Sequence, residues 1–501
     1  MFLKLRNKLQ KRVKLLFKKN KRDFELVPPA QIRASLLSGF DSPKTELTLS
    51  LANRIPHDVL DMIFEEATFV PGALETFTFV PKFSKENEYH RLKESRAAAR
   101  SLTLVCSRWY YAGRPYLYRV VVLDGAESVR LLASAVRGGE GGDPSHDDLS
   151  TRRLDLYLES SEELFDSLAA ILLRMPKLVI FRWRHPIGAA PLSYEESVTR
   201  PHNILHLLKF LEGDSLKVLN CVDGLPRLST RETRDILKSW PHLETLSMSI
   251  WGGGADGTYL VLPRLRSVDI SRMLEIPFRP AETMASLAQV VDTVGGWDAT
   301  GPLTFGYERF RQWFCHQFNR LDSFVLKVDP GANPYSIRHY VENVTRQLSD
   351  LVNFTLILDD WDQLPKDLCV YNAAFLGLGL QDPRLPRHAP QSDRDQHYRH
   401  FFETLSGIVV HPEFQAVYFL DDALYHHSEW QKHKSWHSVA RLLINFQWEI
   451  LARDSTTLVP FPPDLPELPS TSVRIKRTIT MRQSLPAPWT WIDELVDGET
   501  F

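Results

Sequence analysis

Cysteine is scarce in this chain of 501 residues, and the few copies lie far apart. The four cysteines are Cys106, Cys221, Cys315 and Cys369, and no two of them form a Cys-x-x-Cys pair. This spacing fits neither a disulfide scaffold nor a zinc module. We therefore expect a reducing compartment, cytoplasmic or nuclear, in which the glycosylation-like patterns at Asn343 and Asn353 are not used.

Long hydrophobic runs are also missing. The sequence has no run of about 18 apolar residues, so it predicts no transmembrane helix. Hydrophobic residues still make up 43% of the chain, which is enough for a sizeable core. For this length we expect about two to four domains, or one domain followed by a long repeat array.

Net charge is almost absent, but the charges are unevenly distributed. Residues 1–22 hold ten Lys and Arg and no acidic side chain, out of 60 basic and 62 acidic side chains in the whole chain. The rest therefore carries 50 basic and 62 acidic side chains, a net charge of −12, which does not predict nucleic-acid binding by the body of the protein. We interpret residues 1–22 as a basic amphipathic or disordered arm. The alternatives are a nuclear-import or nucleic-acid arm, a membrane-surface helix and, less well, a transit peptide.

Patterns typical of cofactor binding are few. Gly252–Gly257 has the spacing of a dinucleotide-binding loop, but an extended stretch follows where the mechanism needs a helix. Gly138–Gly142 lacks the Lys-Ser/Thr of a phosphate-binding loop. We predict a loop at both places and no cofactor.

Side chains that could bind a metal or transfer protons form three groups. Two groups contain only histidine: His426, His427, His433 and His437, and separately His397 and His400. No cysteine lies near them, so we expect polar helix faces rather than zinc sites. The third group, Asp359, Asp360 and Asp362, closes a strand, where a solvated edge is expected. The sequence predicts no catalytic residue, no metal and no small-molecule substrate.

Two stretches near the front of the chain have helical apolar stripes. In the first, Pro56 suits the first helical position, and Ile55 just before it can pack onto Val59 or Leu60. One face of the helix carries Val59, Leu60, Ile63, Phe64 and Ala67. In the second, the stripe is Ala98, Leu102, Val105, Trp109 and Ala112, and Gly113 and Pro115 are expected to end the helix. Short helices with wide apolar stripes are not stable alone, so these must pack together or on a partner.

This pair of stretches resembles the F-box. The matching pieces are Ile55-Pro56, Asp58, Val59-Leu60, Ile63-Phe64, Leu102, Val105-Cys106, Arg108-Trp109 and Pro115-Tyr-Leu-Tyr118. The resemblance covers residues 47–120. It departs from the family pattern at Asp58, where Glu is usual, and at an insert of residues 68–97, which we expect to be a surface excursion.

The resemblance implies a partner. An F-box would dock the Skp-type linker subunit of a cullin–RING (SCF-type) ubiquitin ligase. The partner-binding residues that the family pattern implies are Ile55, Pro56, Val59, Leu60, Ile63, Phe64, Leu102, Val105, Cys106 and Trp109. Among these, we expect Phe64 and Trp109 to form the core that shapes the docking surface.

Beyond residue 120, helical stretches alternate with short Leu-rich strands. The expected strands are Arg119–Leu123, Arg153–Leu158, Lys177–Phe181, Ser215–Leu219, His242–Met248, Arg264–Ile270, Arg320–Leu326, Asp350–Leu358 and Glu413–Leu420. The expected helices are Leu164–Arg174, Ile204–Leu211, Thr230–Trp240, Phe310–Phe318 and Ile337–Leu348. The intervals from Leu265 to Leu321 and from Leu351 to Phe414 are about twice a leucine-rich period of ~20–29 residues, so each is expected to hide a further strand.

This alternation resembles the degenerate leucine-rich repeats that often follow F-boxes. We predict an α/β protein with an N-terminal F-box helical domain followed by an irregular leucine-rich-repeat-like solenoid; the alternative is an irregular α/β domain. The predicted division is an arm (1–22), a linker (23–46), the F-box-like domain (47–120), a substrate-recognition domain (121–459) and a Pro-rich linker with the C-terminal tail (460–501). The resemblance implies an adaptor that holds a protein substrate and is not an enzyme. The alternative is a scaffold without a ligase role, tethered to a membrane or nucleic acid by residues 1–22.

Overall fold

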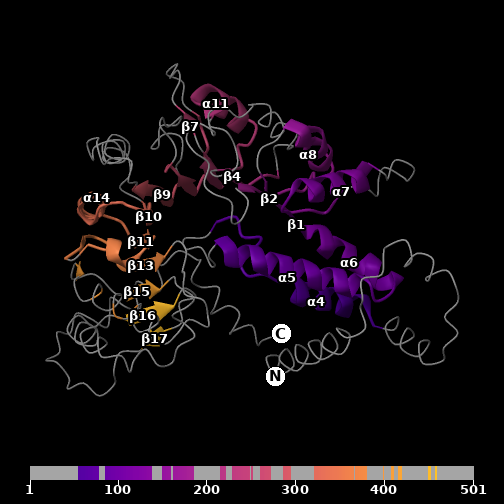
Figure 1. Ribbon diagram of the computed structural model, residues 1–501, viewed down its shortest axis with the longest axis horizontal. Helices are drawn as coiled ribbons and strands as arrows, with labels where there is room; N and C mark the ends of the chain where they lie inside the picture. Colours follow the sequence, from indigo (N-terminus) through magenta and orange to yellow (C-terminus); the bar gives the residue numbers. More distant parts are fainter. Residues whose placement is uncertain are drawn as a thin grey trace.

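The protein is an α/β structure with one large, mainly parallel sheet and several helices (Figure 1). The computed structural model describes residues 55–77, 85–137, 149–158, 162–184, 215–221, 228–248, 250–251, 260–271, 286–294, 321–365, 367–380 and short stretches between 396 and 459. Several predicted features lie outside the described residues: the arm, the linker at 23–46, both glycine loops, the histidine groups, the helices at 204–211 and 310–318, and residues 460–501.

The large sheet has 13 strands, and each new strand is added beside the previous one. In spatial order they are β1 (Val120–Leu123), β2 (Arg153–Tyr157), β3 (Ile180–Arg184), β4 (Val218–Cys221), β6 (Thr245–Met248), β8 (Ser267–Asp269), β9 (Gln289–Val294), β10 (Ser323–Val328), β11 (Asn353–Leu358), β13 (Phe375–Leu380), β15 (Ala416–Phe419), β16 (Glu449–Ala452) and β17 (Thr457–Val459). All neighbours pair in parallel except β16 and β17. Two small sheets pair β5 (Leu228–Ser229) with β7 (Ile250–Trp251), and β12 (Cys369–Val370) with β14 (Val409–Val410).

The sheet curves into an arc, and the helices that follow its strands lie on the outer side (Figure 1). These are α7 (Ala126–Arg137), α8 (Phe165–Leu172), α11 (Thr230–Leu237) and α14 (Pro334–Gln347), with 3₁₀ turns η2 (Glu162–Leu164) and η4 (Trp361–Gln363). The inner side holds a separate helical unit beside β1, made of α4 (His57–Thr68), α5 (Lys85–Thr103) and α6 (Ser107–Arg119). Within the described part of the chain, no helix combines the length and the apolar character needed to cross a membrane.

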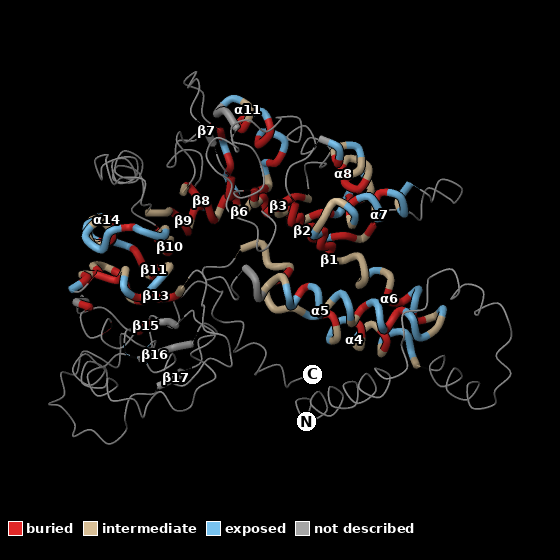
Figure 2. Tube along the Cα trace, in the orientation of Figure 1, coloured by how far each residue is buried: buried red, intermediate tan, exposed pale blue. Residues whose placement is uncertain are grey.

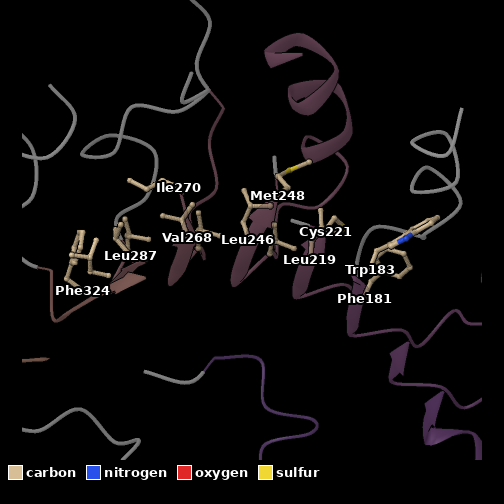
Figure 3. Packing of buried hydrophobic residues seen from close by; sticks show 14 of the residues in the cluster. Phe181, Trp183, Leu219, Cys221, Leu246, Met248, Val268, Ile270, Leu287 and Phe324 are labelled. Atoms are coloured by element: carbon tan, nitrogen blue, oxygen red, sulfur yellow. The ribbon is translucent and has the colours of Figure 1, made fainter. Parts of the chain in front are cut away.

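The outer face of the sheet is buried by a pattern that repeats from strand to strand. Each unit buries an apolar residue two positions before the strand and two more within or just after it, as in Leu243, Leu246 and Met248. The same spacing recurs at Leu216, Leu219 and Cys221, at Leu265, Val268 and Ile270, at Leu321, Phe324 and Leu326, and at Leu351, Phe354 and Leu356. Since the strands pair in register, equivalent side chains line up in rows (Figure 3), and the buried positions follow the arc (Figure 2). Burying one such side chain stabilises the fold by about 1.5–3 kcal/mol.

The predicted strands are present, but from β3 onward each begins three residues later than expected. Lys177–Phe181, for example, corresponds to β3 at Ile180–Arg184. In several units the first leucine lies in a turn before the strand. The N–H of Leu178 donates to the carbonyl of Met175, and the N–H of Leu243 donates to the carbonyl of Trp240. Both hidden strands are confirmed, as β9 and β13.

The second helical stripe was predicted as one helix and is two. α5 ends at Thr103, and α6 begins at Ser107 after Cys106, which is extended with φ −164° and ψ 171°. The predicted end at Gly113 and Pro115 is also wrong, because α6 continues through both residues to Arg119. The break between the two helices is not visible in the apolar pattern, because both helices bury their apolar residues in the same core.

Candidate functional site

The two F-box-like stretches meet in the helical unit. One hydrophobic cluster contains Leu60 and Phe64 from α4, Leu102 from α5, and Trp109 and Ala112 from α6. The rings of Phe64 and Trp109 lie edge to face with centroids 6.0 Å apart, and Tyr116 stacks on Phe64 at 5.5 Å. The stretches that the insert separates in sequence therefore share one small core, in which Phe64 and Trp109 hold the central place predicted for them.

Gly113 lets α4 and α6 approach each other closely. A Cβ atom at this position would lie 2.3 Å from two ring atoms of Phe64 and 2.7 Å from the Thr103 methyl group. Real carbon atoms do not come this close, so a side chain here would push the three helices apart. The residue predicted to end the helix is thus a packing residue inside it.

Charged and polar groups fix the far end of this core. Arg119 at the end of α6 pairs with Glu65 at 2.5 Å and donates to the Thr68 hydroxyl at 3.2 Å, while Thr68 donates to the carbonyl of Phe64. Burial raises the pKa of Tyr116, and the carboxylates of Asp61 and Glu65 raise it further. The acidic flank of α4 therefore faces the end of α6, and its apolar flank with Val59 and Ile63 lies on the other side of the helix.

The ten predicted docking residues fall into three groups by exposure. Leu60, Phe64, Leu102 and Trp109 are buried, so they shape the unit and offer a partner little or no surface. Ile55, Val59, Ile63 and Cys106 are half-buried, and Ile55, Ile63 and Cys106 pack on the cluster from its edge. Only Pro56 and Val105 are exposed.

Further apolar side chains of the unit are exposed that the motif did not include. Leu104 is 76% exposed in the turn between α5 and α6, Tyr111 is 72% exposed on α6, and Met62 is 62% exposed on α4. Tyr110 and Phe69 are exposed as well. We call Met62, Leu104, Val105, Tyr110 and Tyr111 the exposed apolar set. The sequence contained a signal for this set: each residue except Val105 is large and apolar and lies outside the apolar stripe of its predicted helical stretch.

The insert is not the surface excursion that was predicted. Its residues 85–97 form the first two thirds of α5, and Leu92 and Ala73 are buried against Val122 of β1 and Tyr157 of β2. Among its described residues, Phe77, Glu88 and Tyr89 contact side chains of the sheet rather than solvent alone. The helical unit is therefore joined to the sheet through the insert.

Glu88 of α5 binds three arginines of the sheet in this junction. Its carboxylate accepts hydrogen bonds from Arg153 at 2.9 Å, from Arg182 at 2.8 and 3.0 Å, and from Arg184 at 3.1 Å. The three arginines come from the inner faces of β2 and β3. Arg153 also forms a bidentate pair with Asp155 at 2.8 and 2.6 Å.

The charges of this cluster set the pKa of Glu88. Burial pushes the pKa of this carboxyl upward, but the guanidinium groups of Arg182, Arg153 and Arg184 outweigh burial and hold the pKa well below its usual range. Three positive and two negative groups are thus buried together. The pKa of Arg182 is lowered, by its burial and by the nearby Arg153. Burial also lowers the pKa of Arg184, but Glu88, Tyr157 and Asp155 together outweigh burial and raise this pKa.

The segment before the insert's helix extends the junction further along the sheet. The carbonyl of Ala73 accepts from Arg153 at 2.8 Å, and the carbonyl of Thr76 accepts from the Thr245 hydroxyl at 2.7 Å. The Thr76 hydroxyl donates to Glu244, and Arg266 lies over the ring of Phe77 at 4.3 Å. Residues 73–77 therefore reach from β2 to the start of β8.

The aspartate group at the end of β11 has a structural role. Asp360 accepts from the N–H of Asp362 at 3.1 Å and forms a capping box with Gln363 at the start of η4. In the described part of the chain, no group of three or more His, Cys, Asp or Glu side chains could hold a metal ion.

Comparison with known proteins adds no family. No protein-family model matches the chain, and no curated protein is significantly similar to it.

Proposed function

We propose that this protein is a substrate-recognition adaptor of an SCF-type cullin–RING ubiquitin ligase. In this proposal the helical unit binds the Skp-type linker subunit, the sheet domain binds a protein substrate, and catalysis belongs to other subunits. The observation that carries the proposal is the shared core of α4, α5 and α6, built by Leu60, Phe64, Leu102 and Trp109, which are the residues of the F-box-like pattern.

The surface of the helical unit supports a docking role. Leu104 and Val105 form an exposed apolar turn, and Met62, Tyr110 and Tyr111 are exposed on the adjoining helices. Apolar side chains gathered on one small unit are typical of a protein-binding site. Tyr side chains are also favoured at interfaces, because each combines a large apolar ring with a hydroxyl group.

The sheet domain supports the second half of the proposal. Its sequential parallel strands and its repeated burial at positions 0, +3 and +5 are features of a leucine-rich-repeat array, which we propose in degenerate form. The inner faces of β2 and β3 are occupied by the insert, so the substrate would contact other parts of the domain.

The direct test is binding of purified Skp-type linker subunit to the full chain. We expect capture in a pull-down and a saturable heat signal in calorimetry. A folded chain that binds the linker subunit in neither experiment would refute the adaptor proposal.

A scaffold without a ligase role is the second candidate, favoured by the ten basic side chains in residues 1–22. The two candidates separate when the full chain and a chain lacking residues 1–22 are fractionated. Membrane or chromatin association that depends on residues 1–22, without any linker binding, would favour the scaffold.

A further inference from the structure

The contacts between the helical unit and the sheet are of two kinds. The first kind lies along β1, the edge strand. Tyr89 and Lys93 both bind the Asp124 carboxylate at 2.8 Å, and Arg96 donates to the carbonyl of Val122 at 2.8 Å. α6 also leads directly into β1. Contacts along one strand define a line, and a line alone allows the helical unit to pivot.

The second kind of contact lies away from that line. Glu88 reaches β3 through Arg182 and Arg184. Thr76 reaches β6 through Thr245, and Phe77 reaches Arg266, which directly precedes β8. Contacts at a distance from the pivot line are the ones that can fix the angle of the unit against the sheet.

We propose that Glu88 is a positioning residue that sets the orientation of the helical unit on the sheet. Glu88 acts through α5. This helix carries Glu88 near its N-terminal end and Leu102, which lies in the core of the helical unit, near its C-terminal end. The 14 helical steps from Glu88 to Leu102 span about 21 Å at 1.5 Å per residue, so a small rotation at Glu88 moves the exposed apolar set by several ångströms.

Glu88 also balances the charges of the arginines that surround it. Arg182 donates to both oxygens of this carboxylate, and Arg184 relies on it together with the Tyr157 hydroxyl. Without the carboxylate, Arg182 and Arg184 lose the charge that balances them and repel each other and Arg153 across two strands. The site then pushes α5 away, and the angle of the unit is no longer fixed.

The purpose of this orientation rests on the proposed function, since an adaptor has to hold its substrate at a set place relative to the linker subunit. The orientation itself does not depend on that function. It can be measured on the chain alone, so a failure here and a failure of linker binding are distinguishable.

The test is a distance measurement by electron–electron double resonance on the full chain. Spin labels are attached through non-natural amino acids, which leave the native cysteines in place, at the exposed positions Met62 on α4 and Tyr335 on α14. A second pair at Leu173 and Tyr335 lies entirely within the sheet domain and serves as the internal reference. The variants are Glu88→Gln and, as a matched control, Glu163→Gln, which removes only a surface ion pair to Arg130.

We expect a narrow distribution for both label pairs in the native chain. Glu88→Gln should broaden and shift the 62–335 distance and leave the 173–335 distance unchanged, while Glu163→Gln changes neither. An unchanged 62–335 distribution in folded Glu88→Gln protein overturns the inference. Equal broadening of both pairs also overturns it, because that indicates general loosening. If Glu88→Gln does not fold, Arg182→Met removes the two hydrogen bonds that Arg182 of β3 donates to the Glu88 carboxylate, and the same two outcomes decide.

Discussion

Gly113 and Phe64 set the distance between α4 and α6. A Cβ atom at position 113 would lie 2.3 Å from the Phe64 ring, so there is no room for even one methyl group. We therefore expect Gly113→Ala to lower the free energy of unfolding by about 1–3 kcal/mol through overpacking. Chemical denaturation monitored by tryptophan fluorescence measures this. Gly125→Ala is the control, because its Cβ meets nothing within 4 Å and should cost less.

Phe64 and Phe69 provide a matched comparison of a buried and an exposed ring on α4 and at its end. Phe64 is fully buried, whereas Phe69 is 56% exposed. Phe64→Ala should cost about 3–5 kcal/mol, because it removes the ring that contacts Trp109 and Tyr116 and leaves a cavity. Phe69→Ala should change the unfolding free energy by less than about 0.5 kcal/mol. Similar losses in both variants would contradict the assignment of the core.

At the scale of elements, α5 differs most from what the sequence predicts. Glu88 lies 65, 94 and 96 residues from its arginine partners, and no local pattern links residues so far apart. The stripes of α4 and α6 were readable because each buries residues at helical spacing within itself. The break between α5 and α6 was missed for the same reason, since Leu102 and Trp109 face one core across it.

Glu88 should also make stability depend on pH. Its pKa is below the usual value of about 4.3 that it regains on unfolding, so the unfolded chain binds more protons in that window. The stabilisation is present above that value and is lost as the pH falls through the lower, folded-state pKa. At pH 7, Glu88→Gln should cost about 3–5 kcal/mol, because it leaves buried arginines without their partner.

The measurement is a series of urea unfolding curves of the native chain and Glu88→Gln from neutral to acidic pH. The difference between the two should shrink as the pH falls below about 4. Asp124, Glu244 and Asp269 also have lowered pKa values, but they are present in both proteins and cancel in the difference. A difference that stays constant with pH would show that the Glu88 charge is not what stabilises the cluster.

At the scale of the whole molecule, the order of the strands was the most predictable feature. Apolar residues at positions 0, +3 and +5, with leucine at the first, are visible in the sequence, and neighbouring units have to stack because none buries its apolar face alone. The two intervals of about twice the repeat length each predicted a further strand, and these strands are β9 and β13. What the sequence could not provide is the position of the helical unit inside the arc, because that depends on pairings between distant charges and on the turn at residues 73–77.

The arrangement places two surfaces in one molecule. The exposed apolar set lies on the helical unit, and the sheet domain extends away from it along the arc (Figures 1 and 2). An adaptor needs both, one for the linker subunit and one for the substrate. In the proposed adaptor, the linker subunit binds the exposed apolar set.

Linker binding at the exposed apolar set can be tested by calorimetry. The Skp-type linker subunit is titrated into the native chain, into the Leu104→Asp variant and into the Leu131→Asp variant. Both leucines are exposed, 76% and 62%, but Leu104 belongs to the exposed apolar set and Leu131 lies on α7 of the sheet domain. We predict that Leu104→Asp weakens binding by at least ~1–2 kcal/mol, whereas Leu131→Asp binds like the native chain. Equal affinity of all three proteins, or no binding by any of them, would contradict linker binding at the exposed apolar set.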